Sequence, residues 1–121
     1  MRSRFLLVAT LIYAVFGLGL LLVPGPFMAA YDVQFDADGT LLARVAGALL
    51  LSFGVALFLS RNADPAAARP LLLAGLVYNL IELPVTLMAI QSGVMNTMGW
   101  LPFALHVGLV ALFGWYVRAR A

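Results

Sequence analysis

The N-terminal part of the chain reads FLLVATLIYAVFGLGLLLV over Phe5–Val23, without a charged residue. A membrane-crossing helix needs about 20 mostly apolar residues, because the hydrocarbon core is about 30 Å thick. The run is therefore long enough to span a membrane, and it stops at the PGP sequence of residues 24–26, which cannot continue a helix. Arg2 and Arg4 also resemble the start of a secretory signal, but the apolar run exceeds the usual length of about 7–15 residues, which favours a retained span.

Three further segments have the same character. They cover residues 41–60, 70–91 and 99–117, and with residues 5–23 they make four predicted spans. Asp38 or Thr40 is predicted to cap the second span, and Pro70 is predicted to stand in the first turn of the third. Because little chain is left over, the sequence predicts an all-α, integral membrane four-helix bundle, with residues 1–121 forming a single transmembrane domain.

The composition excludes several classes of protein. The chain is 64% hydrophobic and 10% charged, with a mean hydropathy of +1.06, whereas soluble domains average roughly 45–50% apolar and roughly 25% charged residues. It contains no Cys, so it has no disulfide, no thiolate nucleophile and no Cys-based metal site. The formal net charge is only +2, so nucleic acid is not an expected partner. The expected partner is the lipid bilayer.

The arginines predict how the chain is oriented in the membrane. All but one of the seven basic residues fall on one side of the predicted spans, namely Arg2, Arg4, Arg61, Arg69, Arg118 and Arg120. The other side holds Asp32, Asp36 and Asp38, with Arg44 as its basic residue. Cytoplasmic loops carry the excess of basic residues. The pattern therefore predicts a multi-pass protein of the bacterial inner (cell) membrane with both termini in the cytoplasm.

Four polar side chains fall at similar depths in the four spans. At about 1.5 Å per residue, Tyr13, Ser52, Glu82 and His106 lie roughly 12–16 Å from the outer ends of their spans, near the midplane. Asn79 lies one turn from Glu82 on the same face. A polar group at this depth is costly, so these residues are predicted to face the bundle core rather than lipid. Ser52 is expected to bond back to its own helix.

Glu82 is the most informative of these residues. An ionised carboxylate alone in hydrocarbon is untenable, so it must be protonated or paired. His106 is the expected partner, and Arg44, roughly 5 Å below the outer end of its span, could reach inward to Glu82 or outward to Asp36 and Asp38.

The Glu82–His106 pair has two interpretations. It is either a structural hydrogen bond between the third and fourth spans, or a site that binds a ligand or a proton. The candidate residues for such a site are Glu82, His106, Asn79, Tyr13 and Arg44. One His and one buried carboxylate are too few ligands for a metal, so no metal site is predicted.

Small residues predict where helices approach closely. The pairs Ala43–Gly47 and Ala104–Gly108 have the small-xxx-small spacing, while Gly54 follows Gly47 by seven residues and Gly17 follows Tyr13 by four. This spacing allows backbones to pack closely within the bundle or between copies of the chain. Packing within the chain is the preferred interpretation.

Two short stretches carry a family resemblance. LARVAGA at residues 42–48, and NTMGWLP at residues 96–102 followed by ALH at 104–106, resemble the DoxX-like small four-helix inner-membrane proteins of bacteria. The resemblance implies the same architecture, with quinone or thiol redox partners in some members. The resemblance does not assign an activity to any particular residue of this chain. The lack of Cys argues against a direct role in thiol chemistry.

Three functions fit these observations. The first is an accessory or scaffold protein that joins a larger membrane complex, or that binds a lipophilic molecule such as a quinone or a lipid. The second is a small proton-coupled transporter, acting as a homodimer and using Glu82 and His106. The third is a membrane enzyme that acts on a lipid-like substrate with the same two residues as acid and base. Small size and no recognisable catalytic set favour the first.

The predicted orientation can be tested with reporter fusions. Because the arginines hold their side of the protein in the cytoplasm, a reporter fused after Ala121 should report a cytoplasmic location. A reporter inserted near Asp36 should report a periplasmic one. A periplasmic signal from the fusion at Ala121 would contradict both the orientation and the even number of spans.

Overall fold

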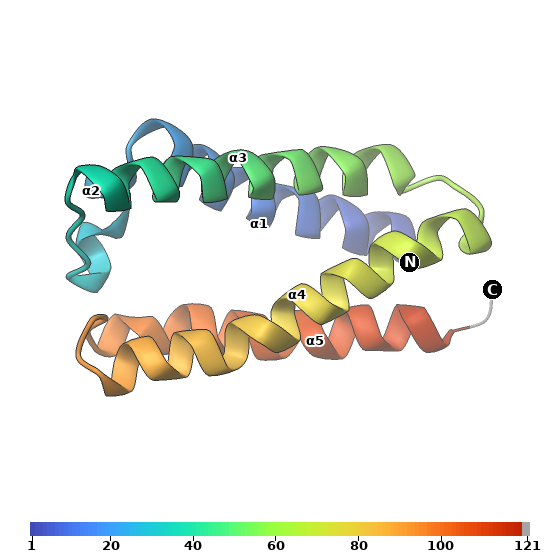
Figure 1. The fold of residues 1–121 in the computed structure, drawn as a ribbon. Helices are drawn as coiled ribbons and strands as arrows, with labels where there is room; N and C mark the ends of the chain where they lie inside the picture. The colour runs from blue at the N-terminus through green and yellow to red at the C-terminus, as the bar shows by residue number, and fades with distance from the viewer. Residues whose placement is uncertain (120–121) are drawn as a thin grey trace. The chain divides into compact units, whose positions relative to one another are not determined.

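Helices make up most of the residues that the structure describes. The structure is a computed structural model that describes residues 1–119, so Arg120 and Ala121, used above for orientation, lie outside the described residues. No strand occurs within residues 1–119. The elements in order are α1 (Arg2–Leu22), α2 (Pro24–Met28), the 3-10 helix η1 (Ala29–Tyr31), α3 (Ala37–Ser60), α4 (Pro65–Gln91), the 3-10 helix η2 (Thr97–Gly99) and α5 (Trp100–Arg118) (Figure 1).

Four of these helices are long and apolar enough to cross a membrane. They are α1, α3, α4 and α5 together with η2, and each matches one predicted span to within a few residues, apart from the start of α4. The predicted all-α class is therefore confirmed for the described residues, and so is the number of helices that are long and apolar enough to span a membrane. The chain separates into two compact units, Met1–Asn62 and Ala63–Ala121. In Figure 1, α1 lies beside α3 in the first unit, and α4 lies beside α5 in the second. A single four-helix bundle stays a prediction.

The prediction for the cap of α3 is wrong. Asp36 caps this helix, because its carboxylate accepts a hydrogen bond of 2.7 Å from the Gly39 N–H. Thr40 lies inside the helix, where its hydroxyl donates to the Asp36 carbonyl at 2.8 Å. Asp36, Asp38 and Thr40 are all residue types that cap helices. Asp36 is the one that caps α3, because the helix begins at Ala37.

The start of α4 also differs from the prediction. The helix begins at Pro65, and Pro70 lies inside it rather than in its first turn. Asp64 caps the helix by accepting from the Ala67 N–H at 3.0 Å, and Pro65 occupies the first turn, where its missing N–H costs nothing. The Ala-rich residues 65–69 favour a helix but are less apolar than the span, so hydropathy placed the boundary too late.

Glycines bring α1 and α3 into backbone contact in the N-terminal unit. A Cβ on Gly17 would lie 2.7 Å from the Leu51 nitrogen and 2.9 Å from the Gly47 oxygen, and one on Gly47 would lie 2.5 Å from the Leu21 nitrogen. Gly54 is likewise buried near Thr10, whose hydroxyl donates to the Leu6 oxygen at 2.8 Å and to the Gly54 oxygen at 3.2 Å. The predicted packing role of the small residues on the second span is therefore confirmed within the chain.

Aromatic contacts and one polar contact complete this unit. Tyr13 is buried and meets the Phe53 ring edge to face, with centroids 5.1 Å apart. Phe27 packs on Phe16 in the same way at 5.4 Å. At the other end of the hairpin, the Ser3 hydroxyl donates to the Asn62 side chain at 3.1 Å.

In the C-terminal unit, α5 packs on α4 through large apolar side chains rather than through the Ala104–Gly108 pair. Leu109 and Phe113 are its buried residues, and a Cβ on Gly75 of α4 would lie 2.5 Å from the Phe113 ring. Ala104 and Gly108 are exposed, and a Cβ on Gly108 would meet nothing within 4 Å. The small-residue pair of α5 therefore takes no part in the α4–α5 contact.

The glycine contact predicts a large difference between two matched substitutions. Gly47→Ala places a methyl group against the α1 backbone, so the helices must separate, and we expect a loss of about 1–3 kcal/mol. Gly108→Ala adds the same group in open space within a helix and should leave stability unchanged or slightly higher. Thermal melts in detergent measure both. Equal melting temperatures for the two variants would contradict the close approach.

Candidate functional site

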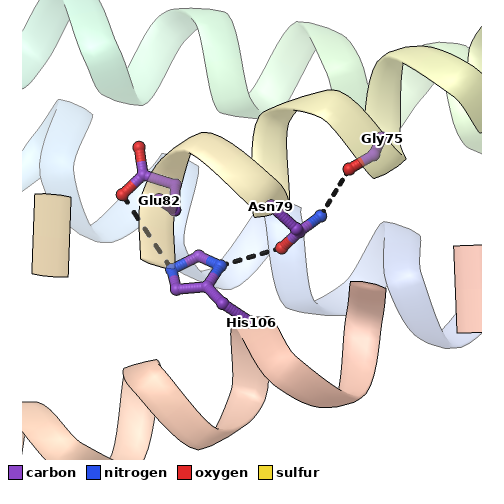
Figure 2. Close-up of polar contacts among 4 residues, drawn as sticks. All are labelled: Gly75, Asn79, Glu82 and His106. Carbon is purple, nitrogen blue, oxygen red and sulfur yellow. Dashed lines mark hydrogen bonds and ion pairs between the residues drawn. The ribbon is translucent and has the colours of Figure 1, made fainter. Parts of the chain in front are cut away.

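The polar residues of α4 and α5 meet in the C-terminal unit. Asn79 and Glu82 are three residues apart in α4, so they lie on the same side of that helix. His106 projects from α5 toward α4, and Figure 2 shows its ring between the Asn79 and Glu82 side chains. The expectation that His106 lies beside Glu82 and Asn79 thus agrees with the geometry.

Asn79 is fully buried, with 0% of its surface exposed. Its amide nitrogen donates to the Gly75 carbonyl at 2.7 Å, one turn earlier in α4. A carbonyl oxygen can only accept, so the NH2 group of Asn79 must be the atom that faces Gly75. The Asn79 Oδ1 therefore faces His106, and it lies 2.8 Å from His106 Nδ1 (Figure 2).

His106 and Glu82 are close without being directly hydrogen-bonded. His106 Nε2 lies 4.0 Å from Glu82 Oε2, which is ion-pair distance but beyond the reach of a hydrogen bond. The His106 side chain is 14% exposed and the Glu82 side chain is 28% exposed. The direct hydrogen bond between the helices therefore runs from His106 to Asn79, while Nε2 of the imidazole makes no direct hydrogen bond to Glu82.

Tyr78 is a member of the site that the sequence analysis did not select. Its ring meets the His106 ring edge to face, with centroids 6.1 Å apart. Its side chain is also hydrogen-bonded to Glu82, four residues further along α4. The signal was present in the sequence, because residues i and i+4 are neighbours on a helix face. Tyr78 now takes one acceptor position of the carboxyl group.

The other candidate residues belong to the N-terminal unit, and each is placed within it. Tyr13 packs on Phe53, as described above. Arg44 is exposed, and within residues 1–119 it forms no hydrogen bond or ion pair with Asp36 or Asp38. The convergence of Tyr13 and Arg44 on Glu82 stays a prediction. Ser52, in contrast, donates to the Ala48 oxygen at 2.8 Å, which confirms its expected bond to its own helix.

Pro84 adds a further acceptor near the site. It lies inside α4, two residues after Glu82. Since proline has no N–H, the carbonyl of Leu80, four residues earlier, loses its helical partner. The helix continues through Pro84, so this carbonyl and the Glu82 carboxyl group both belong to one unbroken helix.

The chemistry open to the site is proton and hydrogen-bond exchange. Across residues 1–119, no three His, Cys, Asp or Glu side chains gather in a way that could hold a metal ion. Glu82 and His106 can together hold one proton, on the carboxyl oxygen or on Nε2, without a net charge. No known protein family, curated protein or solved structure matches the chain.

The hydrogen bond between His106 and Asn79 predicts a pattern of stabilities. His106→Phe removes a hydrogen bond made by the fully buried Asn79 side chain and should cost about 1–3 kcal/mol. The double variant His106→Phe with Asn79→Leu removes both polar groups and should recover much of that loss. Thermal melts in detergent measure each variant.

Glu82→Gln is the matched control for that experiment. The glutamine keeps an oxygen for Tyr78, and the Glu82 carboxyl lies 4.0 Å from the imidazole. We therefore expect it to melt no lower than the wild type. A loss as large as that of His106→Phe would show that Glu82 supports the fold directly.

Proposed function

We propose that this chain is a small membrane protein that binds a lipophilic, quinone-like ligand at Glu82 and His106. Both residues lie inside helices long and apolar enough to cross a membrane, so a ligand that reaches them must be soluble in lipid. Its recognition must come from one or two polar groups, since the side chains around them are mostly apolar. An accessory role in a larger membrane complex is compatible with such a site.

One observation supports binding over a purely structural role. A structural pair should close into a direct hydrogen bond, because each unsatisfied polar group in hydrocarbon is costly. Glu82 and His106 instead stop 4.0 Å apart, and each keeps part of its exposure. The contact that joins the helices is supplied by Asn79. The pair is therefore available to a third group.

The proposal includes a setting in the cell. The four long helices form one bundle, the arginine-rich side faces the cytoplasm, and both termini lie on that side. The membrane is the bacterial inner membrane, and the protein is a DoxX-like one that works as a homodimer or in a larger complex. The support for this setting is the charge asymmetry of the loops and the short motifs quoted above.

Ligand binding predicts a specific pattern among intramembrane variants. We expect a short-chain benzoquinol or benzoquinone to bind the purified protein in detergent or nanodiscs. Glu82→Gln and His106→Phe should each weaken binding about tenfold, the factor that corresponds to one lost hydrogen bond. Titration calorimetry or fluorescence quenching measures the affinities.

Ser52→Ala is the control for this experiment. Ser52 is also a polar residue inside a long apolar helix, but its hydroxyl bonds to its own helix at Ala48. Its removal should leave the affinity unchanged. If Ser52→Ala weakened binding as much as Glu82→Gln, the ligand would not be recognised at the Glu82–His106 pair. If no lipophilic quinol or quinone bound at all, the proposal would be wrong.

Proton-coupled transport is the second candidate function. It is favoured by the ability of Glu82 and His106 to share one proton at 4.0 Å, close to Pro84, which removes one backbone hydrogen bond of α4. Proteoliposomes that contain a pH-sensitive dye separate the two functions. A transporter moves protons across the bilayer when a ligand gradient is imposed, whereas a binding protein does not.

A further inference from the structure

The hydrogen bonds of Asn79 restrict which nitrogen of His106 carries the proton. A neutral imidazole has one N–H group, on either Nδ1 or Nε2. The Asn79 NH2 group is directed at the Gly75 carbonyl, so only its oxygen faces His106 Nδ1 at 2.8 Å. Two acceptors cannot bond to each other, so the hydrogen must be on Nδ1. The nitrogen that faces Glu82 is then an acceptor.

We infer that Asn79 is a positioning residue that holds neutral His106 as the Nδ1–H tautomer, so that the site recognises lipophilic ligands through a hydroxyl group, as in a phenol or quinol, rather than through a carbonyl or ether oxygen. This inference rests on the proposed function and specifies its ligand. Asn79 acts on the ligand only through His106, whose protonated nitrogen it selects, and does not itself touch the ligand.

The preference for a hydroxyl group follows from the two atoms that a ligand must bridge. These are His106 Nε2 and Glu82 Oε2, the two ends of a 4.0 Å gap. When the shared proton is on Glu82, the carboxyl group donates and Nε2 accepts. When the proton is on Nε2, the imidazolium donates and the carboxylate accepts. In both states one end donates and the other accepts, so the group between them must do both. A hydroxyl oxygen can lie about 2.8 Å from both ends when they are 4.0 Å apart.

A carbonyl or ether oxygen satisfies only one end. It can accept from the donating residue, but it has no hydrogen for the accepting one, which is left unsatisfied. A hydroxyl group instead completes a chain in which each member donates to the next. With the proton on the carboxyl group, the chain runs from Glu82 to the ligand, to His106, to Asn79 and to the Gly75 carbonyl.

The other tautomer would reverse the preference. With hydrogen on Nε2 and a protonated Glu82, both ends of the gap would donate. A carbonyl oxygen has two lone pairs and would then satisfy both. Asn79 therefore decides between a hydroxyl and a carbonyl ligand, although it is buried at 0% exposure.

The tautomer can be measured without any ligand. The chain contains one His, so 15N-histidine labelling gives a single imidazole, and NMR at alkaline pH reports which nitrogen carries the hydrogen. We expect the Nδ1–H form in the wild type and a mixture that includes the Nε2–H form in Asn79→Leu. A wild-type protein with hydrogen mainly on Nε2 would overturn the inference, whatever the stability of the variant.

Binding of matched probes tests the ligand class. We expect the wild type to bind a para-alkylphenol about tenfold more tightly than the para-alkylanisole that differs only by a methyl cap on the oxygen. Asn79→Leu should lose this ratio and gain relative affinity for the corresponding benzoquinone. A merely structural role of Asn79 would lower all affinities together and leave the ratio unchanged.

The outcomes separate this inference from the proposed function. Equal binding of the phenol and its methyl ether by the wild type would overturn the hydroxyl recognition while ligand binding stands. Binding of neither these probes nor the quinone would contradict the proposed function and the hydroxyl recognition together. The NMR result then still decides the role of Asn79, because it needs no ligand.

Discussion

Hydrocarbon offers no hydrogen-bond partners, so every polar group inside the membrane must find one within the protein. The backbone meets this constraint by forming helices almost throughout residues 1–119. Polar side chains within the long helices meet it by donating to the carbonyl one turn earlier, as Thr10 does to Leu6 at 2.8 Å, Ser52 to Ala48 at 2.8 Å and Asn79 to Gly75 at 2.7 Å. Thr10 and Asn79 also reach a partner helix, at the Gly54 oxygen of α3 and at His106 of α5, whereas the bond of Ser52 to Ala48 stays within its own helix.

His106 and Glu82 cannot be satisfied in this way alone. An imidazole needs both a donor and an acceptor, and a carboxyl group has several acceptor positions. The protein supplies Asn79 to one side of the imidazole and Tyr78 to one part of the carboxyl group. The remaining atoms, Nε2 and Oε2, face each other across 4.0 Å. These two atoms are the ones to which we assign the proposed ligand.

Much of this architecture could be predicted from hydropathy, because segment length and apolar content depend on composition alone. The ends of helices were harder to predict, since Asp36, Asp38 and Thr40 are all acceptable caps and only the geometry of the first turn selects Asp36. The closeness of Glu82 and His106 followed from matching depths. The choice of Asn79 over Glu82 as the bonded partner did not, because it depends on side-chain rotamers and on the rotation of α5 against α4. The rotation of α5 likewise exposes Gly108, although its spacing matched that of a packing residue.

The contact between Ser3 and Asn62 has a consequence for the order of folding. It joins the first turn of α1 to Asn62, two residues after the end of α3, so both partners of the contact lie within the N-terminal hairpin. Its glycine contacts and its Thr10 bridge also lie within residues 1–62. Because synthesis proceeds from the N-terminus and compact units fold as they emerge, this hairpin can assemble while the ribosome is still translating α4 and α5. The C-terminal hairpin, which carries Glu82 and His106, is then completed after the N-terminal one.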